Sequence, residues 1–466
     1  MGAQIQTVTV PGPSGRGAAV RLASLVRDPL AGYLKLAAQY GDAIRVPISP
    51  RSSFFVLSRP EHAEHVLALS QDNYVKAFTY RPLRALIGNG LLTSEGEQWR
   101  QHRRLIQPMF SRRDVRTFGP AMMSAASRML KDWDALPSAA EVDVASQMSA
   151  LALDVVGRAL FGTDLTNEAD LIRRAMTAGQ RVAVLATFVP VSWGPRSTRA
   201  LKAVARRAGH TTEGIEGPVG RMIAERRARS ADGRQNLLDL LLAARLEDGG
   251  QLTDAEISDE LATFMLAGHE TSAVTLSWSL ALLSAYPAAR DHLEREVDAV
   301  LGGREPEAAD VDSLPWTTAV IAETMRLYPP AWTIERDATA DDIVAGVPVP
   351  AGSTVAIPPY LVHRHADFWP DPAGFDPARF LPVGQHDTAA SSGRGPREDR
   401  HRYAYIPFGG GRRACIGQSL AELETVLVLA SIAQRFRLEL TPTGIPKPTA
   451  AITLRPGRLP MRLLRR

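Results

Sequence analysis

The single cysteine of the chain, Cys415, lies near the end of a glycine-rich stretch that runs from Phe408 to Gly417. Three consecutive glycines at 409–411 allow a tight turn in which the backbone can approach another group closely. Apolar residues at helical spacing follow from Leu420, so the cysteine falls just ahead of a helix N-terminus. Helix dipoles and free N–H groups at such a position favour the thiolate form of cysteine. The stretch therefore predicts a thiolate that can ligate a metal ion.

Two other interpretations of this stretch compete. A lone cysteine often behaves as a small buried hydrophobic residue. A nucleotide-binding loop is the second alternative, since Gly409, Gly411 and Ala414 meet the loose dinucleotide spacing. However, no βαβ unit or ribose-binding acid surrounds these residues, and a Gly-Lys-Ser/Thr ending is missing.

A second candidate group is Ala267-Gly268-His269-Glu270-Thr271-Ser272, in the middle of a long helical pattern. Glycine and hydroxyl residues weaken a helix locally, so we expect a bulge at Gly268 with room for O2 and water. The carboxyl of Glu270 and the hydroxyl of Thr271 suit proton delivery. The alternative is a satisfied polar pair inside a helix bundle. A zinc-protease motif is excluded, because Ala273 stands where a second histidine is needed.

Two further pairs have helical spacing. Trp99 and Arg103 are one turn apart, so the indole N–H and the guanidinium can reach the same anionic group. Glu323 and Arg326 are three residues apart and can form an ion pair. The alternatives are an amphipathic helix with a basic face, which also explains His102, and an ordinary exposed ion pair.

The elements that position these residues are mainly helical. Helical periodicity dominates from Arg112 to Val300, and strand-like alternation is confined to Asp42–Leu57, Ile343–Ala356 and the last 20 or so residues. Thr253 and Glu256 form a capping box that opens a helix of about 33 residues, roughly 50 Å long, ending at Pro287. The polar stretch from His386 to Arg402 is expected to be a surface insertion.

Composition limits the class of protein. Hydrophobic residues make up 45% of the chain and charged residues 22%, as in a globular protein with a large core. The arginines are scattered, which argues against nucleic acid as a partner. One cysteine cannot form an internal disulfide, so we expect the cytoplasm as location. Residues 1–30 contain no long apolar run, so we expect an N-terminal extension without a membrane anchor.

The stretch from Phe408 to Gly417 resembles the Phe-x-x-Gly-x-Arg-x-Cys-x-Gly signature of the cytochrome P-450 family at every fixed position. The segment around Glu270 and Thr271 is similar to the family's oxygen-activation motif. Glu-x-x-Arg and Trp-x-x-x-Arg motifs occur in the family's order, and the resemblance covers the chain from about Gly32 to the end.

The resemblance implies a mainly α fold for residues 31–466. By this resemblance the chain would be a single helical domain with a small β-rich region, and heme would lie between the long central helix and the Cys415 loop. Cys415 would be the axial ligand of the iron in heme b (iron protoporphyrin IX), with Phe408 beside the sulfur and Gly409 in the same cofactor-binding loop. The implied propionate contacts are Arg413, Trp99, Arg103 and Arg336, and the residues implied to hold the heme-binding core are Glu323, Arg326 and Arg379.

The implied activity is that of a heme-thiolate monooxygenase, which hydroxylates or epoxidises an apolar small molecule with O2 and two electrons. Gly268, Glu270 and Thr271 would be its catalytic residues. Electrons would come indirectly from NAD(P)H through a ferredoxin and a ferredoxin reductase, because the chain has no flavin domain. Basic residues that would steer an acidic ferredoxin are Arg100, Arg104, Arg112, Arg113 and Arg412.

By the same resemblance, apolar segments line the substrate pocket. These are Phe78–Leu92, Val182–Trp193, Thr263 with Phe264 and Ala267, Ala331–Ile334 including Trp332, and Ala450–Thr453 including Ile452. No cluster of charges is dedicated to a charged substrate, so tailoring of a terpenoid or polyketide natural product is favoured. A fatty-acid hydroxylase is the first alternative, followed by a heme isomerase or peroxygenase and a non-catalytic heme sensor.

Overall fold

The computed structural model describes residues 10–15, 25, 27–49, 52–165, 213–228, 236–246, 249–381, 400–442 and 444–466. The chain forms two compact units, and each is built from two separate segments. The first unit comprises residues 1–80 and 323–415, and the second comprises residues 81–322 and 416–466. Two expected features, the loop His386–Arg402 and the extension 1–30, lie largely outside the described residues. The expected boundary between extension and domain stays a prediction.

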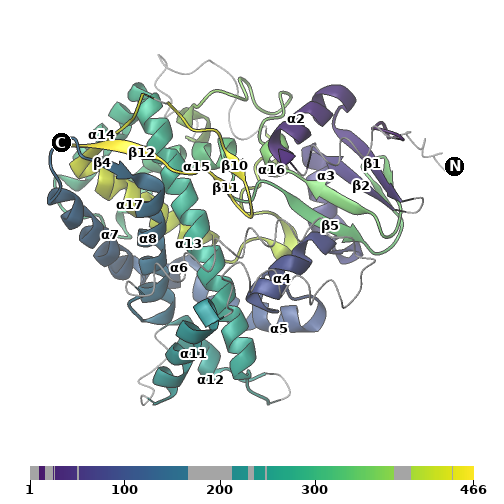
Figure 1. The fold of residues 1–466 in the computed structure, drawn as a ribbon, viewed down its shortest axis with the longest axis horizontal. Helices are drawn as coiled ribbons and strands as arrows, with labels where there is room; N and C mark the ends of the chain where they lie inside the picture. Colours follow the sequence, from purple (N-terminus) through teal and green to yellow (C-terminus); the bar gives the residue numbers. More distant parts are fainter. Residues whose placement is uncertain are drawn as a thin grey trace. The chain divides into compact units, whose positions relative to one another are not determined.

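A five-stranded sheet organises the first unit (Figure 1). Its strand order is β1 (Ala43–Ser49), β2 (Ser52–Leu57), β8 (Thr354–Ile357), β5 (Ile334–Ala338) and β3 (Tyr74–Lys76). Strands β2 and β8 run parallel, and the other neighbours are antiparallel. Because these strands come from residues 43–76 and 334–357, the sheet joins the two segments of the unit. Their buried faces, including Phe55, Val355 and Ile334, form one apolar core.

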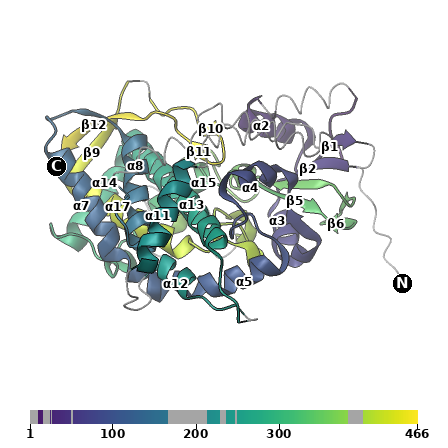
Figure 2. The same ribbon diagram turned by 60° about the horizontal axis from the view of Figure 1, so that its bottom comes forward.

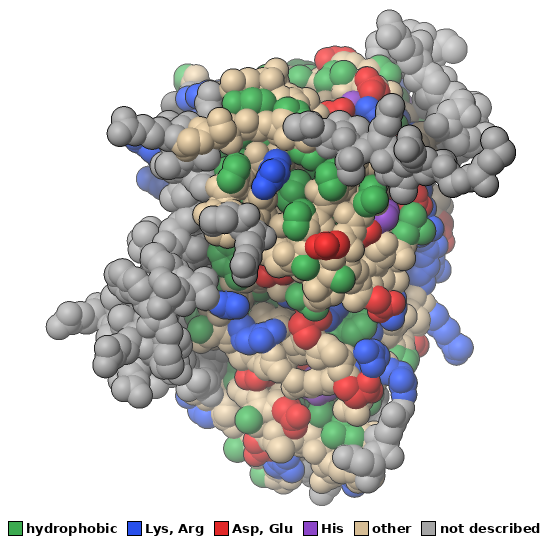
Figure 3. All heavy atoms as spheres, turned by 90° about the vertical axis from the view of Figure 1, so that its right-hand side faces the viewer, with side chains coloured by type: hydrophobic (Ala, Val, Ile, Leu, Met, Phe, Trp, Pro, Cys, Tyr) green, Lys and Arg blue, Asp and Glu red, His purple; other side chains and the backbone are tan. Residues whose placement is uncertain are grey.

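Short elements surround this sheet. They are α2 (Pro29–Tyr40), α3 (Pro60–Glu64), the π-helix η1 (His65–Leu69), η2 (Gln71–Asn73), η3 (Phe78–Tyr80), the hairpin β6 (Asp342–Val344) and β7 (Val347–Val349), α16 (Pro359–Val362), η8 (Pro377–Phe380), η10 (Arg402–Ala404) and η11 (Gly411–Arg413). On the face drawn in Figure 3, Lys and Arg side chains are interspersed with Asp and Glu side chains. This mixing agrees with the nearly balanced composition of the chain.

The first unit also holds a fully buried ion network. Helix α15 (Pro315–Leu327) carries Glu323 and Arg326 near its end, and both side chains are fully buried. Two hydrogen bonds of 2.7 Å join the guanidinium of Arg326 to the two carboxylate oxygens of Glu323. The Nε atom of Arg379 lies 3.4 Å from the same carboxylate. Arg326 also donates to the carbonyls of His363, Pro372 and Gly374, so the network holds the segment 363–379 in place.

The second unit is mainly helical. Its helices are α4 (Arg81–Ile87), α5 (Gly96–Ile106), η4 (Gln107–Phe110), α6 (Arg112–Arg116), α7 (Gly119–Asp134), α8 (Val144–Val156), the π-helix η5 (Gly157–Phe161), α11 (Glu213–Ala228), α12 (Leu237–Ala243), α13 (Asp254–Ala285), α14 (Pro287–Leu301), η7 (Asp310–Ser313) and α17 (Gln418–Arg435). Its strands are β4 (Glu141–Asp143), β9 (Phe436–Leu440) and β12 (Pro460–Arg465) in one sheet, with the pair β10 (Thr449–Ala450) and β11 (Leu454–Arg455).

Helix α13 is the central element of this unit. The predicted capping box is present, because the Glu256 amide donates to Thr253 Oγ1 and the Thr253 amide donates to Glu256 Oε2. The helix has 32 residues and ends directly before Pro287, as expected. Most of its side chains are buried, and it packs along α8, which lies beside it in Figures 1 and 2.

One stretch, Val144–Phe161, is long and apolar enough to cross a membrane by length and composition alone. Within the protein, 67% of this 18-residue window is buried. Burial of this extent is typical of a core helix.

Candidate functional site

A hydrogen bond of 2.8 Å from the Cys415 amide to the Phe408 carbonyl closes the glycine-rich loop. Gly409 and Gly411 have φ values of +72° and +64°, in the left-handed region that favours glycine. A Cβ atom on Gly411 would lie 1.8 Å from the carbonyl oxygen of Leu67, so no larger residue fits there. The glycines are therefore needed for the turn and for its close approach to η1.

Cys415 is exposed, although cysteine is among the residue types most often fully buried. It lies three positions before Gln418, the first residue of α17, and Gly417 is the N-cap of that helix. Both the exposure and the helix N-terminus are what a thiolate ligand of a metal needs. The side chains of Phe408 and Arg413 in the same loop are partly buried.

Arg336 on β5 is buried, with an exposed fraction of 7%. Its guanidinium donates to the carbonyl of Glu335 at 2.9 Å. Within the described part of the chain, no carboxylate lies within ion-pair distance of it. The carboxyl of Glu335 interacts with Arg336 electrostatically at a longer distance. A buried cation without a close ion-pair partner is costly. Because a heme propionate would supply that partner, the donor set of this unit fits heme.

The middle of α13 exposes a narrow strip. Ala267 is exposed, and Gly268 and Thr271 are partly exposed, while nearly all neighbouring residues are buried. Residues at these spacings share one face of a helix. The strip carries no charged group, so an apolar substrate or O2 could contact the helix there.

The expected bulge at Gly268 is wrong. Helix α13 is continuous from Asp254 to Ala285, and the hydroxyl of Thr271 donates to the carbonyl of Ala267 at 2.7 Å. A Cβ on Gly268 would lie 2.9 Å from Cγ2 of Val156. The glycine therefore allows α13 and α8 to pack closely and does not interrupt the helix.

Glu270, the predicted acid, is buried and paired with Arg455. Arg455 Nε donates to Glu270 Oε1 at 2.5 Å, and the hydroxyl of Thr453 donates to the same oxygen. Nδ1 of the neighbouring His269 donates to the Met265 carbonyl at 3.1 Å, and burial lowers the pKa of this histidine. Sequence reasoning missed Arg455, because nothing local relates it to a residue so far away along the chain.

Helix α5 places Trp99 and Arg103 one turn apart, as predicted. Trp99 is buried, and Arg103 Nε donates to Gln107 Oε1 at 3.0 Å. His102 does not belong to a basic solvent face, because it is buried and its ring contacts Glu260. A shared anion between Trp99 and Arg103 stays a prediction.

The residues predicted to contact substrate have mixed surroundings. Phe264 is buried in a stack with Phe110, with ring centroids 5.3 Å apart. Ala331 is exposed, Ile452 is partly exposed, and Trp332 lies 5.9 Å from the ring of Tyr33. The segment Val182–Trp193 lies outside the described residues.

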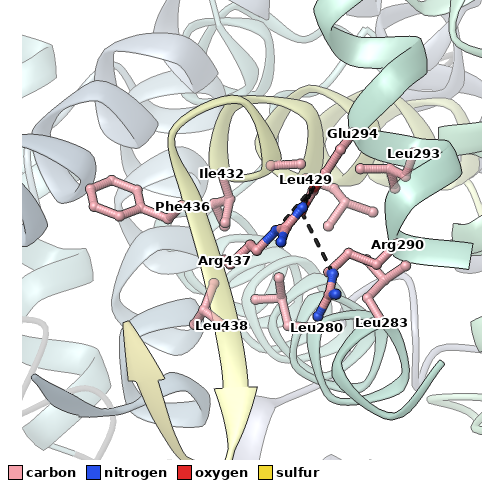
Figure 4. A pocket seen from close by; sticks show the side chains of 11 residues that line it. Leu280, Leu283, Arg290, Leu293, Glu294, Leu429, Ile432, Phe436, Arg437 and Leu438 are labelled. Atoms are coloured by element: carbon pink, nitrogen blue, oxygen red, sulfur yellow. Dashed lines mark hydrogen bonds and ion pairs between the residues drawn. The ribbon is translucent and has the colours of Figure 1, made fainter. Parts of the chain in front are cut away.

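Figure 4 shows a small cavity elsewhere in the second unit, of about 20 Å³. A space of this size holds about one water molecule. Apolar side chains of α13, α14, α17 and β9 line it, and Glu294 pairs with Arg290 and Arg437 at its edge. None of the predicted substrate contacts lines this cavity, so we do not assign it to substrate.

Glu424 on α17 is a further buried acid that sequence reasoning missed. Its exposed fraction is 2%, and Ser272 donates to its Oε2 at 2.7 Å. The other oxygen has no hydrogen-bond partner in the described part of the chain. Burial raises the pKa of Glu424 to about 8. The Glu424 side chain is thus largely protonated at neutral pH. Its partner Ser272 directly follows Thr271 in the sequence.

Comparison with known proteins agrees with this site. The chain matches the family described as "Cytochrome P450" over residues 16–460. It is 34% identical to "Pentalenene oxygenase" of Streptomyces avermitilis, over 95% of this chain and 94% of the relative. It is 33% identical to "Cyclooctatin synthase" of Streptomyces melanosporofaciens, over 96% and 94%. Among solved structures, "Crystal structure of cytochrome P450DA heme domain" superimposes with a TM-score of 0.83 at 25% identity, covering 99% and 98% of the chains.

The mainly helical fold with its small sheets and the exposed cysteine loop therefore define a heme-thiolate protein. The chain belongs to the cytochrome P450 family. It is an oxidoreductase, a heme-containing monooxygenase.

The buried carboxyl of Glu424 predicts a pH-dependent stability. The folded state keeps a proton that the unfolded chain loses above the ordinary glutamate pKa of 4.5, so stability falls as pH rises from about 4.5 to about 8 and then levels off. Glu424→Gln removes this loss. The variant should gain stability relative to the wild type by a few kcal/mol, in order of magnitude, between pH 5 and pH 9.

Denaturant unfolding at pH 5, 7 and 9 measures this difference. Glu422→Gln is the control, because Glu422 lies on the same helix but is only partly buried. An equal stability difference between Glu424→Gln and wild type at pH 5 and pH 9 would contradict the assignment.

Proposed function

We propose that this P450 oxidises a terpenoid and that the sulfur of Cys415 would ligate the heme iron. The ligand assignment rests on the exposed thiol of Cys415. Its loop lies so close to the Leu67 carbonyl that only glycine fits at position 411. Bound heme supplies the activation of O2, and a thiolate ligand favours cleavage of the O–O bond. Every other role assigned below is performed by side chains of the chain itself.

Buried and partly buried cations hold the two propionates in this proposal. Arg336 carries the strongest support, because its guanidinium is buried and forms no close ion pair among the described residues. Arg413, Trp99 and Arg103 are the other proposed contacts. Glu323, Arg326 and Arg379 have a positioning role, since their network fixes the backbone between residues 363 and 379.

Proton delivery is assigned to Thr271 and Glu270. The Thr271 hydroxyl is on the exposed strip of α13 and donates to the Ala267 carbonyl; once released from that carbonyl, it would be able to donate a proton on this face of the helix. The Glu270 carboxyl is ion-paired with Arg455 and hydrogen-bonded by Thr453. To carry a proton toward Thr271, the carboxyl must first separate from Arg455, which makes that ion pair a control point for the proton supply.

The terpenoid substrate is supported by the relatives. Pentalenene oxygenase, cyclooctatin synthase and "Cyclooctat-9-en-7-ol 5-monooxygenase" all match this chain along most of their length. The exposed strip at Ala267 and Gly268 is uncharged, as an apolar substrate requires. A role in tailoring a natural product follows.

A ferredoxin and its NAD(P)H-dependent reductase are the proposed electron donors, and the cytoplasm is the proposed location. Two of the five predicted docking arginines have ion-pair partners, since Arg100 contacts Glu97 and Arg412 contacts Asp72. Arg112 and Arg113 at the start of α6 are exposed, and no described carboxylate pairs with them. These two therefore offer the stronger attraction for an acidic ferredoxin.

The substrate class is tested by titrating the ferric, heme-loaded enzyme with pentalenene, a cyclooctatin precursor alcohol, a medium-chain fatty acid and a macrolactone. We expect a saturable low-to-high-spin shift with a terpenoid, because an apolar ligand displaces water from the iron. A shift with the fatty acid alone would instead favour the fatty-acid hydroxylase alternative.

The docking surface is tested by Arg112→Glu combined with Arg113→Glu. The rate of reduction by a bacterial ferredoxin should fall about tenfold or more at low salt, and its salt dependence should weaken. Arg295→Glu is the control, because Arg295 is also exposed and only contacts a backbone carbonyl. Unchanged rates and salt dependence in the double variant would refute this docking surface.

A further inference from the structure

Two consecutive acids near the start of α13 hold a loop that was predicted to line the substrate pocket. The Asn89 amide donates to Asp259 Oδ2 at 2.7 Å, and the Leu91 amide donates to Glu260 Oε2 at 3.1 Å. Both contacts lie within the second unit. Since the loop 88–93 joins α4 to α5, these two carboxylates fix its backbone against α13.

Two glycines make this contact possible. A Cβ on Gly88, where φ is +76°, would lie 1.9 Å from Asp259 Oδ1. A Cβ on Gly90 would lie 2.3 Å from Thr263 Oγ1 and 2.7 Å from the Asp259 carbonyl oxygen. The loop backbone thus lies directly on the helix, with no room for side chains between them.

Glu260 is fully buried and has a second partner on α5. Nδ1 of His102 lies 2.7 Å from Glu260 Oε1, and both side chains are almost completely buried. A buried carboxylate is tolerated only when its oxygens are hydrogen-bonded. One carboxylate therefore ties three elements together: α13, the loop 88–93 and α5.

The loop also stabilises itself, but only locally. The Thr93 hydroxyl donates to the Gly88 carbonyl at 2.7 Å, and the amides of Thr93 and Ser94 donate to the Gly90 carbonyl. These bonds shape the turn without attaching it to the helix. The amides of Asn89 and Leu91 instead depend on the two carboxylates of α13.

We propose that Asp259, Glu260 and His102 are positioning residues that set substrate selectivity by fixing the loop 88–93 on α13. None of the three needs to touch the substrate. They act through Leu91 and Thr263, which are both buried where the loop meets the helix. The inference rests on the proposed function in one respect, since it takes the segment 78–92, which includes most of this loop, as a wall of the substrate site.

Amide hydrogen exchange tests the attachment itself, with no need for a substrate. In Glu260→Ala the Leu91 amide loses its acceptor, so its exchange should become about tenfold faster or more. Glu260→Gln keeps an oxygen acceptor and should exchange nearly as slowly as wild type. Asp259→Ala should accelerate Asn89 exchange, and its half-buried side chain makes it the variant to use if Glu260→Ala does not fold.

Asp254→Ala is the matched control, because it removes an exposed acid from the same helix without touching the loop. It should leave the exchange of both amides unchanged. Unaltered exchange at Leu91 and Asn89 in the Glu260→Ala and Asp259→Ala variants would overturn the attachment.

Selectivity is then measured as the ratio of spectral Kd values for a small and a large ligand that both shift the spin state. The ratio should change about fivefold or more in Glu260→Ala and return toward wild type in Glu260→Gln, a rescue that general destabilisation does not produce. Faster exchange with an unchanged ratio would overturn the selectivity role. Any two ligands that shift the wild-type spectrum can be used for this ratio. The selectivity test therefore does not depend on the terpenoid assignment, which the separate ligand titration tests.

Discussion

The hydrogen bond from the Cys415 amide to the Phe408 carbonyl holds a thiol in an exposed position directly ahead of α17. Cysteine is among the residue types most often fully buried, so the surrounding chain must keep this one accessible. Gly411 permits it, because the loop lies against the Leu67 carbonyl where no side chain fits. The sheet of the first unit fixes η1 and Arg336, and the Glu323–Arg326 network fixes the backbone before the loop. These contacts of the first unit together hold the loop in which the sulfur atom of Cys415 is accessible.

A second constraint governs α13, which is buried on most of its surface yet carries several polar side chains. Each of these needs a partner, because an unsatisfied buried group costs several kcal/mol in order of magnitude. Glu260 is satisfied by Leu91 and His102, and Glu270 by Thr453 and Arg455. Ser272 is paired with Glu424. The polar groups of α13 thus connect it to a loop, a strand and another helix. These contacts fix the orientation of α13 about its own long axis.

Local signals in the sequence were sufficient for part of this arrangement. The capping box at Thr253 and Glu256 and the end of α13 before Pro287 were predicted correctly, because both depend on residues within one or two turns. The helical position of the residues after Cys415 was equally visible. Glu323 and Arg326 were expected to pair from their spacing, and they do so through two hydrogen bonds.

The rest depends on contacts between distant residues. No local pattern connects Glu270 with Arg455, Glu260 with His102, or Ser272 with Glu424. Gly268 shows how a local rule fails, because a glycine in a helix was taken as a point of weakness although its role is close packing against Val156. A glycine can be required by close packing or by a positive φ. For Gly268 the close contact with α8 shows that packing is the reason.

The assignment of Cys415 as the iron ligand is tested most directly by the reduced carbon-monoxide difference spectrum of the heme-loaded protein, recorded for wild type and Cys415→Ser. The wild type should give the red-shifted Soret band that names the family, and the variant should lose it while keeping its fold. A band of the same position in Cys415→Ser, or no such band in intact heme-loaded wild type, would contradict the account.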